Sequence, residues 1–145
     1  MADTVSTIYR YPPNFDGYYA NNKGTRRMVV QFTNLSDGTG ESDVIKLVRE
    51  DLRGTNGDVC KKLCIEKIEY HTYGMGVHIE YDMNPQQTIA QIAQSSHGIM
   101  PGPWYPDLNE DDDYEVGETG NILFTTIAAA SNDTYDITLH LVVKE

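Results

Sequence analysis

Apolar and polar residues alternate along several short stretches of this chain, which is the pattern of a β-strand with one buried face. The clearest case is residues 77–83, where apolar side chains share one face and polar side chains share the other. Residues 135–143 show the same alternation. Weaker forms of the pattern predict further strands at residues 28–33, 44–48, 63–72 and 122–127.

The links between these stretches have the composition of turns. Residues 36–40, Ser-Asp-Gly-Thr-Gly, predict a tight turn. Residues 73–76 and 131–134 are short links, and each predicts a hairpin between the two strands on either side of it. The apolar alternation changes phase near Glu66 and Lys67, which predicts a β-bulge there.

Residues 84–97 leave two alternatives open. A helix would begin at Asn84-Pro85 and stop at Gly98, with three apolar side chains on one face. The other alternative is a short strand followed by a loop. Residues 98–118 are rich in Pro, Gly and Asp and predict a long exposed loop.

Seven or eight short strands with turns between them, and no alternation of strands with helices, predict an all-β fold. The expected architecture is an antiparallel β-sandwich, jelly-roll-like, formed by residues 26–145. A chain of 145 residues is long enough for one such domain with its own core.

Residues 1–25 follow neither the strand nor the helix period and predict an extended N-terminal arm. Such an arm is either a disordered or self-packed terminus, or a strap that lies on a partner with its aromatic rings as anchors. Trp104, next to Tyr105 in the predicted loop, is either a lid on the core or an exposed contact. The candidate partner-binding residues are Tyr9, Tyr11, Phe15, Tyr18, Tyr19, Trp104 and Tyr105.

The formal net charge of −11 is unevenly distributed. Residues 1–67 hold 10 basic and 9 acidic residues and are nearly neutral, whereas residues 68–145 hold 13 acidic residues against Lys144 alone. A surface of that composition repels a phosphate backbone, so we expect no nucleic-acid partner.

We expect no secretory signal and no membrane association. The first residues lack a basic and apolar leader, and no apolar run approaches the ~20 residues that cross a bilayer. Cys60 and Cys64 are four residues apart, about 13 Å in an extended strand, which is beyond disulfide reach. They are expected to be free thiols in a protein made in a reducing cytoplasm.

The acidic segment at residues 107–118 resembles part of a calcium-binding loop. Asp107, Asn109, Asp111 and Glu118 have suitable spacing. The sixth position is Asp112, where the sharp turn of such a loop needs glycine, and the preceding residues are proline-rich instead of helical. A solvated acidic loop is therefore the preferred interpretation, and no metal or other cofactor is expected.

Other candidate chemistry is weaker. His78, Glu80 and His140 supply the residue types of a two-histidine, one-carboxylate iron site, but each lies on the polar face of its strand and is expected to face solvent. There is no Gly-x-Ser-x-Gly elbow and no glycine-rich phosphate loop. We therefore expect a protein without catalytic activity.

Five segments of the chain resemble a family of small structural proteins encoded near the capsid genes of tailed bacteriophages, cyanophages among them. The segments are residues 32–42, 63–68, 74–77, 120–126 and 133–139. The resemblance implies a jelly-roll-like sandwich on the virion surface, made in the host cytoplasm. It also implies a homo-oligomer, with a trimer at capsid three-fold positions favoured. It transfers no catalytic residue.

Two hypotheses of function follow, with a third kept for contrast. The first is a capsid decoration (cement) protein that binds the major capsid protein and stabilises the phage head. The alternative is a carbohydrate- or receptor-binding sandwich displayed on the virion, because aromatic rings stack on sugars. The third is a metal-dependent enzyme of the double-stranded β-helix type, which needs an inward-facing cluster of histidines and carboxylates.

Overall fold

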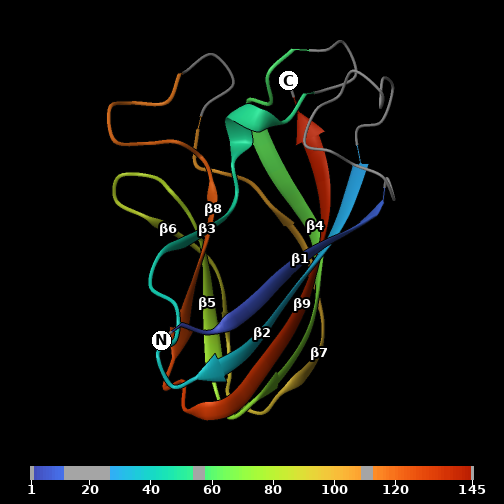
Figure 1. The fold of residues 1–145 in the computed structure, drawn as a ribbon. Coiled ribbons are helices and arrows are strands. Elements are labelled where there is room, and N and C mark those ends of the chain that lie inside the picture. The colour runs from blue at the N-terminus through green and yellow to red at the C-terminus, as the bar shows by residue number, and fades with distance from the viewer. Residues whose placement is uncertain (1, 12–26, 54–57, 109–112, 145) are drawn as a thin grey trace.

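Two antiparallel sheets pack face to face in the computed structural model, which describes residues 2–11, 27–53, 58–108 and 113–144 (Figure 1). These residues contain one short 3₁₀ turn, Arg49–Asp51, and no α-helix. The strands are β1 (Thr4–Tyr11), β2 (Arg27–Asp37), β3 (Val44–Leu47), β4 (Lys62–Tyr73), β5 (Gly76–Tyr81), β6 (Gln87–Ile92), β7 (His97–Trp104), β8 (Ile122–Ile127) and β9 (Ser131–Lys144).

The five-stranded sheet has the order β1-β2-β9-β4-β7, and the four-stranded sheet has the order β3-β8-β5-β6. Every strand pair is antiparallel. The predicted all-β antiparallel sandwich is therefore confirmed, while the jelly-roll topology stays a prediction.

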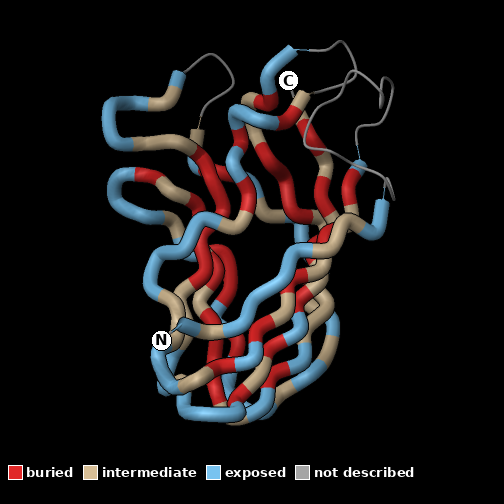
Figure 2. Tube along the Cα trace, in the orientation of Figure 1, coloured by how far each residue is buried: buried red, intermediate tan, exposed pale blue. Residues whose placement is uncertain are grey.

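The core lies between the two sheets, where the buried residues of seven of the nine strands gather (Figure 2). Along β9 the alternate residues from Tyr135 to Val143 are buried, and the residues between them are not. Three aromatic rings meet at the centre. The ring centroid of Phe124 lies 5.2 Å from that of Phe32 and 5.7 Å from that of Tyr135, and both pairs are edge to face. The predicted bulge near Glu66 is confirmed, since the register of β4 shifts between Ile65 and Lys67 in both of its ladders.

Both predicted hairpins are wrong. β4 belongs to the five-stranded sheet and β5 to the four-stranded sheet, so the link between them crosses from one layer to the other. The same holds for β8 and β9. The reason is that β9 lies between β2 and β4, which fill both of its edges. A short link between two strands of alternating apolar and polar residues has the same sequence pattern in two cases. It can join neighbouring strands of one sheet, or it can cross from one sheet of a sandwich to the other.

The extended arm predicted for residues 1–25 is corrected in its first part. Thr4–Tyr11 forms β1, an edge strand that pairs with β2. None of its eight side chains is buried, so the strand leaves no apolar period in the sequence and is held largely by main-chain hydrogen bonds. Residues 12–25 lie outside the described residues.

Two further segments of uncertain character are strands. Residues 87–92 form β6, so the strand alternative is correct there and the helix is not. Residues 97–104 form β7 against β4, although residues 98–104 belong to the long loop predicted from the sequence. Pro101 and Pro103 concealed this strand, but β7 is a sheet edge, where a missing N–H is tolerated.

Candidate functional site

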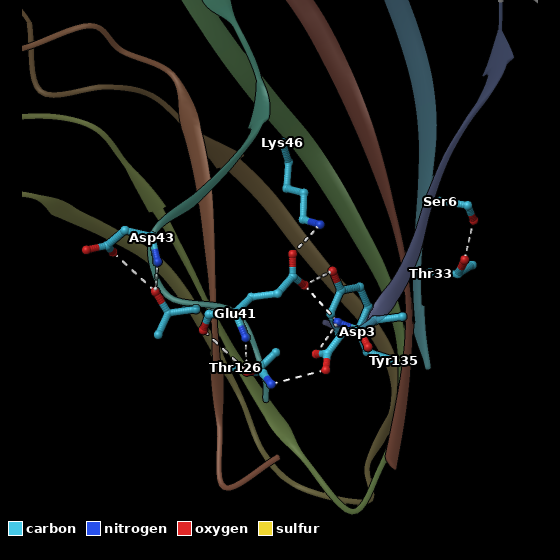
Figure 3. Close-up of polar contacts among 11 residues, drawn as sticks. Asp3, Ser6, Thr33, Glu41, Asp43, Lys46, Thr126 and Tyr135 are labelled. Carbon is cyan, nitrogen blue, oxygen red and sulfur yellow. Dashed lines mark hydrogen bonds and ion pairs between the residues drawn. The ribbon is translucent and has the colours of Figure 1, made fainter. Parts of the chain in front are cut away.

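A buried ion pair lies between the sheets, close to the edge formed by β1, β2 and β3 (Figure 3). Lys46 Nζ is 2.5 Å from Glu41 Oε2, and the two side chains are only 5% and 6% exposed. The other carboxylate oxygen, Glu41 Oε1, accepts hydrogen bonds from Tyr135 Oη at 2.5 Å and from Asn34 Nδ2 at 2.9 Å. A buried charge pair needs such full satisfaction, because desolvation otherwise outweighs the attraction.

Asp3, just before β1, continues this network. Its Oδ2 accepts from Asn34 Nδ2 at 3.1 Å, and its Oδ1 accepts from Ser36 Oγ at 3.0 Å. Oδ1 also accepts from the backbone N–H groups of Asp37 at 3.2 Å and Gly40 at 3.1 Å. Burial raises the pKa of Asp3, but these four donors outweigh it and the net pKa is lowered from 3.8. Asp3 thus ties the start of β1 to the turn after β2.

We call Asp3, Asn34, Glu41, Lys46 and Tyr135 the Asp3–Glu41 cluster. All four carboxylate oxygens of Asp3 and Glu41 already have donors. None of them can bind a substrate or metal without breaking a hydrogen bond or the ion pair. Burial and the neighbouring Glu41 carboxylate raise the pKa of Tyr135, which disfavours a proton-transfer role. The cluster is suited to holding the sheets and the N-terminal strand together.

The structure separates the predicted aromatic residues. Tyr9 and Tyr11 lie on β1, at one edge of the five-stranded sheet, with Tyr9 half-buried and Tyr11 50% exposed. Trp104 ends β7 at the opposite edge, where it packs against the core. This packing of a partly buried side chain corresponds to the lid alternative. The Trp104 carbonyl accepts a hydrogen bond from Tyr81 Oη at 3.0 Å. The remaining three predicted residues, Phe15, Tyr18 and Tyr19, lie outside the described residues.

Tyr105, which follows Trp104, is 43% exposed and lines a groove of about 490 Å³. Its hydroxyl and the Cys64 thiol are hydrogen-bonded to each other, and Lys144 Nζ lies 5.3 Å from its ring centroid. Arg27 and Glu66, which also line the groove, form an ion pair. Sequence reasoning found only Tyr105 here, because the other residues come from separate strands.

The last carboxylate of the acidic segment binds backbone N–H groups. Glu118, the last position of the calcium-like pattern, accepts hydrogen bonds from the N–H groups of Asn84 at 2.9 Å and Glu115 at 3.0 Å. Asn109 and Asp111 lie outside the described residues. Among the residues that the structure describes, no three His, Cys, Asp or Glu side chains are grouped to hold a metal ion.

The other weak candidates do not converge. His78 and Glu80 lie on β5 of the four-stranded sheet, whereas His140 lies on β9 of the five-stranded sheet. Cys60 and Cys64 are free and buried. Burial raises the pKa of the Cys60 thiol to about 12 and also raises the pKa of Cys64, so neither thiol is an activated nucleophile.

Comparison of the chain with protein-family models, with curated proteins and with solved structures gave no match. Within the described ranges, no helix has the length and apolar character needed to cross a bilayer.

Proposed function

We propose that this chain is a protein-binding β-sandwich that decorates a bacteriophage capsid, and that strand β1 is its main contact with the shell. The observation that carries the proposal is the edge position of β1. Among the residues that the structure describes, this strand ends the five-stranded sheet, and Arg10 is its one charged residue. Val5 and Tyr11 are 47% and 50% exposed. Such an edge presents unpaired main-chain groups to a partner strand.

The other three sheet edges are less suited to strand pairing. β3 has only 4 residues, and β7 contains two prolines that lack an N–H donor. Beside β6, the Gln87 side chain bonds the Tyr105 carbonyl at 2.7 Å, so the chain after β7 passes next to the start of that strand. β1 is therefore the longest edge without proline.

The Asp3–Glu41 cluster supports the same proposal. By fixing the start of β1, it presents the strand in one conformation, which lowers the entropy lost on binding. The resemblance to phage structural proteins supplies the partner, the major capsid protein, and self-association as a trimer. In this proposal the sandwich stabilises the head by bridging neighbouring subunits.

Binding to purified heads tests the proposal. Heads lacking the protein are mixed with the full chain, and the bound amount is measured relative to the major capsid protein. We expect a fixed ratio and a higher disruption temperature of the heads. A chain that does not bind, or that leaves head stability unchanged, contradicts the capsid role.

A charged edge variant tests the contact surface. Val5→Lys combined with Tyr11→Lys places two lysines on β1, where they oppose strand pairing. We expect at least tenfold weaker binding to heads. The matched control is Ile99→Lys on β7, where the side chain is 59% exposed. If both variants melt like the parent protein and bind heads equally well, β1 is not part of the interface.

The groove beside Tyr105 favours a second candidate function, carbohydrate or receptor binding. An exposed ring next to charged side chains is suited to stacking on a sugar while bonding its hydroxyls. Screening the protein on a glycan array tests this function. Binding that Tyr105→Ala abolishes supports it, and an array without binding rejects it.

A further inference from the structure

We infer that His71 and His97 form a binding site for a divalent transition-metal ion on the outer face of the five-stranded sheet. The two residues are direct cross-strand partners on β4 and β7. Their ring centroids are 6.0 Å apart, with the ring planes inclined by 38°. Both side chains are exposed, so an ion reaches them from solvent without a change in the core.

The spacing of the rings is close to that of two ligands on one ion. Zinc binds imidazole nitrogen at about 2.0–2.1 Å, so two rings on one tetrahedral ion have centroids about 5 Å apart. Because both side chains are exposed, a rotation of their side-chain torsions can close the difference from 6.0 Å. Imidazole is a preferred ligand of zinc, copper and nickel, whereas calcium and magnesium prefer oxygen. The site therefore takes a zinc, copper or nickel ion. Because the described residues contain no group of three ligands, water completes the coordination.

The backbone around the pair is held in place by neighbouring bonds. The Thr72 N–H donates to the Ser96 carbonyl at 2.8 Å, and the Ser96 N–H donates to Thr72 Oγ1 at 3.0 Å. Thr72 Oγ1 in turn donates to the Ala93 carbonyl at 2.8 Å. These bonds join the residues directly beside His71 and His97. The backbone positions of the two histidines are thus fixed in the absence of an ion, so only their side chains need to be ordered on binding.

A carboxylate adjoins the pair on the other side. Asp136 on β9 is the direct cross-strand partner of His71, so the order across the sheet is His97, His71, Asp136. Gln31 Nε2 orients this carboxylate by donating to its two oxygens at 2.8 and 2.9 Å. Metal-binding histidines commonly donate their second ring N–H to such a carboxylate, which orients the ring and strengthens the ligand.

An ion at this site would tie β7 to the sheet. β7 is an edge strand with Pro101 and Pro103, so its ladder to β4 has fewer donors than a regular strand. A bond from His97 through the ion to His71 adds a cross-strand link at the first residue of β7. The inference is independent of the capsid proposal, since it concerns the stability of the sheet.

Titration of the tag-free full chain with zinc chloride and nickel chloride, followed by calorimetry, tests the site. We expect one ion per chain. At a free zinc concentration ten times the dissociation constant, the melting temperature should rise by about 4 °C. His71→Ala, and separately the conservative His97→Gln, should weaken binding at least tenfold and remove this rise.

Two other histidines are the matched controls. His78 lies on the other sheet, and His140 lies beside Glu69, with Nε2 and Oε2 3.4 Å apart. His78→Ala and His140→Ala should bind zinc as the parent protein does. Unchanged binding by a His71→Ala/His97→Ala double variant overturns the inference, as does the absence of binding at millimolar zinc. Melting in the presence of a chelator confirms that each variant is folded.

Discussion

Substitution of Lys46 by methionine should destabilise the protein by about 3–5 kcal/mol, because it leaves the buried Glu41 carboxylate without its counter-ion. The two charged atoms are 2.5 Å apart, and the side chains are only 5% and 6% exposed. At an effective dielectric constant of about 20, the gross attraction at that distance is about 7 kcal/mol. The desolvation of both ions offsets part of it, but the desolvation of Glu41 persists in the variant.

Urea denaturation followed by circular dichroism measures this loss. For a domain of 145 residues, 1 kcal/mol corresponds to about 3 °C in melting temperature, so the variant should melt about 10–15 °C lower. The matched control is Lys67→Met. Lys67 lies 3.9 Å from Glu69 in a pair that is 41% and 43% exposed, and its loss should cost at most about 0.5 kcal/mol.

The double variant Lys46→Met/Glu41→Gln separates a charge effect from a packing effect. Glutamine keeps an acceptor oxygen for Asn34 and Tyr135 but carries no charge. We therefore expect the double variant to be more stable than Lys46→Met alone, with a total cost of about 1–2 kcal/mol. The reasoning is refuted if Lys46→Met costs less than about 1 kcal/mol. It is also refuted if the double variant loses as much as the two single variants together.

Three further predictions concern Asp3, Gly74 and the two buried cysteines. The ionised form of Asp3 is favoured in the folded state, so its stabilisation is present above about pH 4 and disappears as the pH falls through the lowered pKa. The advantage of the parent protein over Asp3→Asn in urea denaturation should therefore be full at pH 7 and decrease as the pH falls below about 4. A difference that does not vary with pH contradicts the role of the carboxylate. Gly74→Ala should cost about 2–3 kcal/mol, because φ is +80° and the new Cβ would lie 2.0 Å from a carboxylate oxygen at the start of β9. Gly117→Ala, with φ +89° and nothing within 4 Å, should cost only about 1 kcal/mol in the same assay, and equal losses would show that the contact is unimportant. Because Cys60 and Cys64 are buried with raised pKa values, a thiol-specific chromogenic reagent should modify both about a hundredfold more slowly in native than in unfolded protein; rapid reaction of either native thiol would show that its site opens to solvent.

The fold class follows from local patterns that do not depend on the rest of the chain. The alternation along β5 and β9 predicts which side chains of these strands are buried, because successive residues of a strand face opposite sides. The phase break at Glu66 predicts the bulge in β4 for the same reason. Strands without such a pattern escaped detection. β1 buries no side chain, and β7 contains two prolines.

The assignment of strands to sheets depends on competition between distant segments. The link from Tyr73 to Gly76 is short enough for a hairpin, yet β4 pairs with β9, more than 60 residues along the chain. β9 buries one complete face, and cross-strand side-chain pairs stabilise it most when β2 and β4 flank it on both sides. A local pattern contains no information about that preference.

The amino-acid sequence by itself determined that the chain is an antiparallel β-sandwich, and it determined where most of the strands lie. The polar sites were decided only by the tertiary structure. Asp3, Glu41 and Tyr135 form one cluster although 132 positions separate the first from the last, and His71 meets His97 only through the β4–β7 register. The physical reason is that burial is periodic along a strand, whereas a contact between side chains depends on which strands the core brings together.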